Sequence, residues 1–174
     1  MDAALDAVIG KVRQAAARAR PLRIRGGGSK DFYGQRLHGE LLDVRPLAGV
    51  VDYEPTELVV TVRAGTRLRE LQALLADSGQ CLPFEPPQFG VGSTIGGAVA
   101  AGLSGPARAS VGSLRDYVLG VQIVNGKGEL LTFGGQVMKN VAGYDVSRLM
   151  AGSLGTLGVI VQVSLKVLPV PPAE

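Results

Sequence analysis

The sequence has few of the residues that form disulfides or bind metals. It contains one cysteine, Cys81, one histidine, His38, and no tryptophan. A single cysteine cannot form an intrachain disulfide, which fits a reducing compartment such as the cytoplasm. The histidine stands between Leu37 and Gly39, with no cysteine or carboxylate cluster at ligand spacing, so we interpret it as a loop residue. We therefore expect no metal site.

Long apolar runs and aromatic residues are also scarce. Every apolar run is interrupted well before the roughly 18 residues that a membrane-spanning helix needs. Aromatic residues make up 5% of the chain, and no basic stretch is interleaved with rings that stack on bases. The net charge of +3 makes nucleic-acid binding the rival from another functional class, but the lack of stacking side chains argues against it. The sequence predicts neither a membrane span nor a nucleic-acid partner.

Glycine, by contrast, is abundant, and positive charge is concentrated near the N-terminus. The 174 residues include 25 glycines, roughly twice the average usage of about 7%. Residues 1–36 hold eight Lys or Arg against three Asp or Glu, whereas the remainder holds ten against twelve. A solvated basic helix accounts for much of this excess, and an anionic partner is the alternative interpretation.

The apolar periodicity predicts an α+β protein. Helices are expected over residues 1–20 and 67–79, the second with Thr66 as its N-cap. Strands are expected at 41–44, 57–63, 117–124, 129–133 and 158–168. The strands 117–124 and 129–133 enclose Asn-Gly-Lys-Gly, which is typical of a β-hairpin. Prolines within residues 83–90 mark a break, so we expect a single domain over residues 1–174, with subdomains of about 1–85 and about 86–174.

Three glycine-rich segments are the strongest candidates for a binding site. The first, RGGGSK at 25–30, fits neither G-x-G-x-x-G nor the P-loop pattern, but its consecutive amides could surround a phosphate. The second is GVGSTIGGAVAAG at 90–102, and the third is KNVAGYDVSRLMAGSLGTLGVIVQ at 139–162. A plain turn or tight packing explains any one of them. Together they favour one extended ligand that has phosphates and a ring system.

These segments carry a family resemblance. RGGGSK, PPQFGVGSTIGGAVAAG, GSLRDYVLGVQIVNGKGELLTFGG and KNVAGYDVSRLMAGSLGTLGVI occur in this order between about Pro21 and Pro169. In this order they resemble the FAD-binding domain of the vanillyl-alcohol oxidase type (PCMH-type) flavoproteins, a group that includes D-lactate dehydrogenases and bacterial glycolate oxidase. The resemblance implies a fold of two subdomains, a small mixed sheet and a larger antiparallel sheet flanked by helices, with FAD between them.

The resemblance also implies a role for individual residues in binding FAD. The pyrophosphate loop would consist of Gly26, Gly27, Gly28, Ser29 and Lys30, with Arg25 adding charge. The residues along the pyrophosphate, ribityl and isoalloxazine portions would be Pro86, Gly92, Ser93, Thr94, Gly96 and Gly97. Gly112 and Asp116 would line the flavin side of the second subdomain, and Gly155, Val159 and Ile160 would meet the adenine end and the flavin edge.

Two departures from the family pattern refine the expectation. Some relatives attach FAD covalently through a histidine in the glycine loop, but Ser29 occupies that place, so FAD is expected to be non-covalent. Many relatives that carry out the oxidation read GSEGTLG where this chain has Leu154, which resembles the accessory FAD-binding subunit of bacterial glycolate oxidase. Whole members of the family continue into a substrate-covering domain, which we expect to be absent here.

The expected function is that of an FAD-binding module in an oxidoreductase that oxidises a 2-hydroxy acid, with glycolate as the substrate. The implied partners are a catalytic flavin subunit and an iron–sulfur subunit, and the implied location is cytoplasmic, with peripheral attachment to the inner membrane through those partners. The sequence yields no set of nucleophile, base and orienting residue, so the isolated chain is not expected to be a complete catalyst. The alternative is a flavin-free assembly module of the same complex.

Overall fold

The computed structural model describes residues 2–36, 38–136 and 143–172. Its helices are α1 (Ala3–Ala17), α2 (Leu68–Asp77), α3 (Ile95–Ala101), α4 (Arg108–Val111), α5 (Val146–Leu149) and the 3₁₀ turns η1 (Pro55–Glu57) and η2 (Leu114–Tyr117). Its strands are β1 (Leu22–Arg25), β2 (Glu40–Asp43), β3 (Val50–Glu54), β4 (Val59–Arg63), β5 (Gln80–Cys81), β6 (Val118–Val124), β7 (Leu130–Gly134), β8 (Val159–Lys166) and β9 (Leu168–Pro169). The α+β class predicted from the sequence is confirmed.

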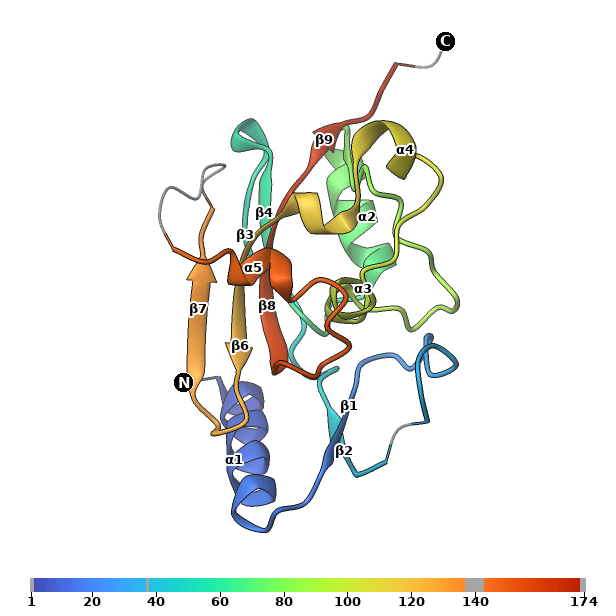
Figure 1. The fold of residues 1–174 in the computed structure, drawn as a ribbon. Helices are drawn as coiled ribbons and strands as arrows, with labels where there is room; N and C mark the ends of the chain where they lie inside the picture. Colours follow the sequence, from blue (N-terminus) through green and yellow to red (C-terminus); the bar gives the residue numbers. More distant parts are fainter. Residues whose placement is uncertain (1, 37, 137–142, 173–174) are drawn as a thin grey trace.

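The strands form a small parallel sheet and a larger antiparallel one, as Figure 1 shows. β1 and β2 run parallel, whereas the larger sheet has the order β3-β4-β8-β6-β7 with antiparallel neighbours. The predicted hairpin is present as β6 and β7, and its turn is held by the Asn125 side chain, which accepts from the amides of Lys127 and Glu129. The short strands β5 and β9 make a third pairing.

The boundary between the two main sheets lies earlier than the prolines suggest. β3 and β4 belong to the larger sheet, because β4 pairs along its length with β8, about a hundred residues later in the chain. Residues 50–63 therefore join residues 118–166 in one sheet, although they precede the expected division at about residue 85. Proline marks a local break in the chain, but a pairing between distant strands has no local signal.

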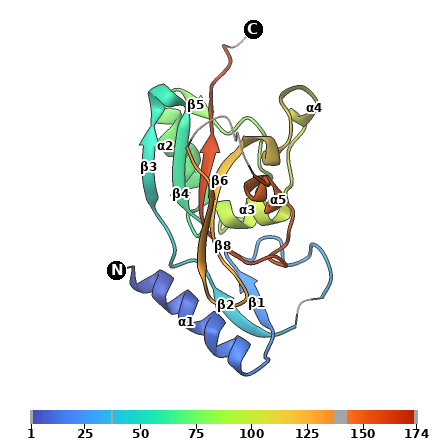
Figure 2. The same ribbon diagram turned by 60° about the vertical axis from the view of Figure 1, so that its left-hand side comes forward.

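Helix α1 joins the small sheet to the larger one. Asp2 caps it by accepting from the amides of Ala4 and Leu5, at 3.1 and 3.3 Å. Its buried residues pack in one apolar cluster with residues of β2, β6 and β8: Val8, Val12, Leu42, Val124, Val159 and Val161. Arg13 donates from Nε to the carbonyl oxygen of Gly128 in the β6–β7 turn, so the helix is also tied to the larger sheet. Figure 2 shows α1 below the larger sheet and alongside β1 and β2.

The main core lies between the larger sheet and the helices α2 and α3. Leu71 and Leu75 of α2 and Ile95 of α3 are fully buried against this sheet. Thr66 does not cap α2 as expected: the N-cap is Arg67, and the Thr66 hydroxyl instead exchanges hydrogen bonds with the backbone of Gly49. Within the described ranges, no helix is long and apolar enough to cross a membrane.

Candidate functional site

A cleft of about 160 Å³ opens where the small sheet meets α3. Its walls are the loop that follows β1, one face of α3 along its length and the segment that precedes β8, which converge in Figure 1. Most of the residues predicted to bind a cofactor line it: Arg25, Gly26, Gly27, Gly28, Ser29, Lys30, Thr94, Gly96, Gly97, Gly155 and Ile160. Three glycine-rich segments that lie far apart in the sequence therefore form one site.

The loop after β1 has a run of amides without acceptors. Within the described part of the chain, the backbone N–H groups of residues 26–30 make no hydrogen bond to protein. Gly28 has a φ of +71°, in the left-handed region that favours glycine. The loop is closed by the amide of Asp31, which donates to the carbonyl oxygen of Gly28 at 3.2 Å. Consecutive unpaired amides in such a turn form a concave site for an anion.

Gly27 has a packing role that the sequence pattern did not reveal. A Cβ atom built on Gly27 would lie 1.5 Å from the carbonyl oxygen of Gly92. The same two loops are joined by a hydrogen bond of 2.9 Å from the Ser93 hydroxyl to the Ser29 hydroxyl. Gly92 and Ser93 are thus placed behind the glycine loop, where they support it and do not line the cleft.

The two glycines at the start of α3 face different neighbours. Thr94 caps the helix, with its hydroxyl oxygen accepting from the amide of Gly97 at 3.2 Å. A Cβ on Gly96 would lie 2.7 Å from the Cβ of Ala64 on the other side, so Gly96 lets the helix pack closely on the chain after β4. A Cβ on Gly97 would meet only the Thr94 hydroxyl, at 3.2 Å. The bare surface of Gly97 therefore widens the cleft.

The segment before β8 docks on the C-terminal end of α3. The amides of Gly152 and Leu154 donate to the carbonyl oxygens of Val99 and Ala100, each at 2.9 Å. These bonds satisfy carbonyls that the end of a helix leaves unpaired. Leu154 itself has a φ of +52° and lines the cleft. The bonds place Gly155 opposite the glycine loop.

Two cations line the cleft, and they differ in their partners. Arg25 is paired with Asp31, with Nε and Nη2 both 2.8 Å from the same carboxylate oxygen. Lys30 is partly buried and has no carboxylate partner among the described residues, and its Nζ stands 5.9 Å from the centre of the Phe89 ring. Burial lowers the pKa of Lys30 from its ordinary value. A buried, unpaired ammonium beside free amides indicates a site for an anionic ligand.

A family model described as FAD binding domain matches residues 4–134. The chain belongs to this family of FAD-binding domains. It is 54% identical over 169 residues to the glycolate oxidase subunit GlcE of Escherichia coli strain K12, a match that covers 97% of this chain and 48% of the relative. It is also 32% identical over 133 residues to the glycolate oxidase subunit GlcD of Bacillus subtilis strain 168, with 76% of this chain and 28% of the relative covered.

A third relative is the D-2-hydroxyglutarate dehydrogenase of Xanthomonas citri pathovar viticola, 34% identical over 136 residues, which cover 78% of this chain and 29% of the relative. The chain spans about half the length of the Escherichia coli relative and less than a third of the other two. The predicted PCMH-type FAD-binding domain is thus confirmed, with FAD as its cofactor.

The geometry of the cleft fits FAD at the pyrophosphate. Residues 26–30 line the cleft and have amides without a protein acceptor, and Lys30 offers a charge that no carboxylate neutralises within the described residues. Hydrogen bonds between amide or ammonium donors and phosphate oxygens are among the strong ones because the acceptor is charged. The glycine loop and Lys30 therefore supply the donor set that a dinucleotide phosphate needs.

Besides Gly92 and Ser93, four of the predicted site residues lie outside the cleft. Val159 is buried in the cluster beneath α1, and Pro86 lies in a separate shallow depression next to Cys81. Gly112 and Asp116 lie at η2, where the Asp116 carboxylate accepts from the amide and hydroxyl of Ser113. These two bonds lower the pKa of Asp116. None of the four lines the cleft, so their assignment to FAD stays a prediction.

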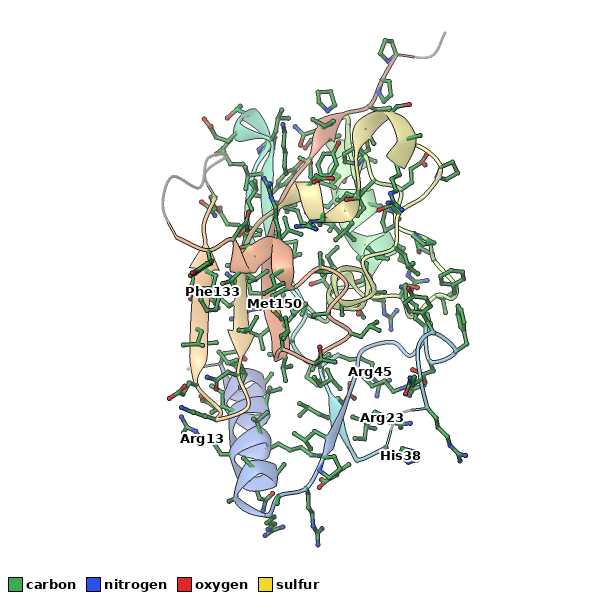
Figure 3. The ribbon with its side chains drawn as sticks, viewed as in Figure 1. Arg13, Arg23, His38, Arg45, Phe133 and Met150 are labelled. Atoms are coloured by element: carbon green, nitrogen blue, oxygen red, sulfur yellow. The ribbon has the colours of Figure 1, made fainter. Side chains whose placement is uncertain are left out.

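Several cleft residues were missed by the sequence analysis. Asp31 lies directly after the glycine motif, and Tyr33 and Gln35 follow it, but no pattern marked them. Ala100 and Ala101 had a usable signal, because they lie three and four residues after Gly97 and so share its face of α3. The single histidine, His38, is exposed beside the small sheet (Figure 3) and does not line the cleft. Among the described residues, no cluster of His, Cys, Asp or Glu has the geometry of a metal site.

Lys30 yields a prediction on the pH dependence of FAD binding. Burial lowers the pKa of Lys30 in the free protein, and a bound phosphate raises it again, so the affinity falls as the pH rises through the lowered value. The fall begins below the ordinary lysine pKa of about 10.4. Titration of FAD binding between neutral and alkaline pH measures it. The matched control is Lys30→Arg, which keeps its charge throughout, and a fall of equal size in that variant would contradict the assignment.

Proposed function

We propose that this chain binds FAD non-covalently in the cleft, with the pyrophosphate on the amides of residues 26–30 and beside the Lys30 ammonium. The observation that carries the proposal is the run of acceptor-free amides next to a partly buried lysine that has no carboxylate partner among the described residues. The Gly97 surface and the Gly155 backbone provide the narrow walls between which an extended ligand lies.

The non-covalent mode is supported by the residues of the glycine loop. Ser29 stands in the middle of the cleft lining, and its hydroxyl already accepts a hydrogen bond from Ser93. Histidine and cysteine, whose side chains can bond to a flavin, are absent from the described residues that line the cleft. The loop therefore binds FAD by hydrogen bonds and charge.

The proposed role of the module is in the oxidation of a 2-hydroxy acid, with glycolate as the substrate. The Escherichia coli and Bacillus subtilis relatives are both glycolate oxidase subunits by name, which supports this assignment. FAD supplies the two-electron redox chemistry, and the residues of this chain bind and orient it. We place the chain in an assembly with a catalytic flavin subunit and an iron–sulfur subunit, through which it is attached to the membrane.

A spectrum of the purified protein tests the proposal. We expect the oxidised flavin absorption to be present, or to be restored by added FAD, and to pass completely into the supernatant when the protein is precipitated by acid. Flavin that remained with the denatured polypeptide would contradict the non-covalent mode. A protein that contained no flavin and bound no added FAD would support the flavin-free assembly module instead.

A further inference from the structure

The guanidinium of Arg25 lies across the inside of the glycine loop. Its Nε donates to Oδ2 of Asp31 at 2.8 Å, and its Nη2 lies 2.8 Å from the same oxygen, so the ion pair connects the first and last residues of the RGGGSKD segment. The guanidinium also covers the Cα of Gly28, because a Cβ there would lie 2.2 Å from Nη2 and 2.5 Å from Cζ. The segment is thus held by an ion pair at its ends and by contact with Arg25 in the middle.

The position of Asp31 is unexpected for an anion site. Its carboxylate lines the same cleft as the free amides and Lys30, where it repels phosphate and occupies the Arg25 guanidinium. The side chains of Arg25 and Asp31 remain 38% and 47% exposed, so solvent screens the pair and its contribution to global stability is small. Attraction of an anionic ligand does not explain why a carboxylate stands at position 31, because the carboxylate repels phosphate. Stability of the fold does not explain it either, because the ion pair is screened by solvent.

We propose that Asp31 is a positioning residue for FAD, which acts by holding Arg25 across the loop so that the amides of residues 26–30 face the cleft before FAD arrives. The inference rests on the proposed function, because it assumes that these amides bind the pyrophosphate. Arg25 then acts as a brace for the loop and not as a phosphate ligand.

The physical reason lies in the three consecutive glycines. Glycine loses more backbone freedom on ordering than any other residue, so an unbraced GGG loop would sample many conformations in which its amides point away from the ligand. A loop that is already ordered binds more tightly, because the ligand does not have to supply the free energy of ordering it. Asp31 contributes at two points, since its amide also donates to the Gly28 carbonyl oxygen.

The competing interpretation makes the opposite prediction. If Arg25 binds phosphate directly, Asp31 competes with the ligand for the guanidinium. Removing the carboxylate would then free a cation and remove a repelling charge, so FAD would bind more tightly. The sign of the change in affinity therefore separates the two roles.

The experiment compares Asp31→Ala with the matched control Asp43→Ala in FAD titrations that follow flavin fluorescence. Asp43 forms a comparable ion pair with Arg45, at 2.7 Å, but it does not line the cleft. We expect Asp31→Ala to weaken FAD binding about fivefold, which equals about 1 kcal/mol, the upper end for an exposed ion pair. Asp43→Ala is expected to leave the affinity unchanged, with a similar melting temperature in both variants.

Two further measurements isolate the positioning role. Asp31→Asn keeps an oxygen that can accept from Arg25, so it should retain part of the affinity that alanine loses, whereas a purely electrostatic effect would be the same in both variants. Hydrogen exchange in the FAD-free protein should be faster in Asp31→Ala than in the unchanged protein at the two amides that are hydrogen-bonded within the loop, those of residue 31 and Tyr33, which donate to the carbonyl oxygens of Gly28 and Lys30. This readout does not depend on bound flavin.

Each result has a defined meaning. Equal or tighter FAD binding by Asp31→Ala, or unchanged protection of the amides of residue 31 and Tyr33, would overturn the positioning role while the proposed function stands. Failure of the unchanged protein to bind FAD would overturn both. Weaker binding together with faster loop exchange, at an unchanged melting temperature, is the result that the proposal requires.

Discussion

Gly27→Val is expected to abolish FAD binding and to lower the melting temperature of the protein. A Cβ on Gly27 would lie 1.5 Å from the carbonyl oxygen of Gly92 and 2.3 Å from its carbonyl carbon. Backbone atoms cannot avoid a clash by changing rotamer. The loop after β1 and the loop that contains Gly92 must therefore separate, and the hydrogen bond between Ser29 and Ser93 must break. Overpacking of this kind costs about 3 kcal/mol of folding stability. The displaced loop no longer presents its amides together, so we expect the FAD dissociation constant to rise by about 100-fold or more, which equals about 2.7 kcal/mol of binding free energy.

The measurement is a FAD titration together with a thermal melt, and Gly10→Ala is the control. Gly10 lies in α1, and a Cβ there would have no neighbour within 4 Å. Replacing an exposed helical glycine by alanine adds up to about 1 kcal/mol of stability, so this variant should melt at a higher temperature and bind FAD as before. A Gly27→Val protein that bound FAD with unchanged affinity would show that the loop after β1 is not part of the site.

The glycine loop shows how far the sequence alone could lead. The run of glycines before the Ser-Lys pair fitted a plain turn as well as an anion site, and only the three glycine-rich segments together favoured a ligand; the structure brings all of residues 25–30 to one cleft. The reason for each glycine could not be predicted, because it depends on a neighbour distant in sequence. Gly27 is glycine because Gly92 packs on it, and Gly96 because it packs on Ala64.

The strand pairings also show that contacts between residues distant in sequence could not be predicted. The strands β6 and β7 were predictable because their turn residues are adjacent in sequence. The pairing of β4 with β8 was not, since it joins residues 59–63 to residues 162–166 and only the three-dimensional structure brings them together. Asp31 was missed for a third reason: its function depends on the geometry of the Arg25 side chain, which no residue pattern encodes.

Among the six residues assigned to FAD that lie outside the cleft, Asp116 is the clearest case. The family resemblance made it a candidate for the flavin, but its carboxylate is occupied by the Ser113 amide and hydroxyl at the start of η2. An acidic residue three positions after a serine is the pattern of a helix-capping box. The local structure therefore accounts for this aspartate without a ligand.

The 174-residue chain is expected to bind FAD and yet to oxidise neither glycolate nor D-lactate. Oxidation of a 2-hydroxy acid needs a base within about 3 Å of the hydroxyl proton and cations that hold the substrate carboxylate. Among the described residues that line the cleft, the titratable side chains are Arg25, Lys30, Asp31 and Tyr33. Asp31 and Arg25 are engaged with each other, and Lys30 is the cation that we assign to the phosphate. Of these four only Tyr33 remains, and a phenol supplies no cation to hold the substrate carboxylate.

Anaerobic mixing of the FAD-loaded protein with each acid tests this expectation, because reduction bleaches the oxidised flavin band. Chemical reduction with dithionite provides the control, since it shows that the bound flavin can accept electrons when no substrate site is required. We expect full bleaching by dithionite and none by glycolate or D-lactate over minutes. Bleaching by either acid at about 1 per second or faster, the lower end for working enzymes, would mean that a complete substrate site exists within these 174 residues. The base and the carboxylate-binding cation would then come from outside the cleft, or Lys30 would hold the substrate carboxylate and lose its exclusive assignment to the phosphate.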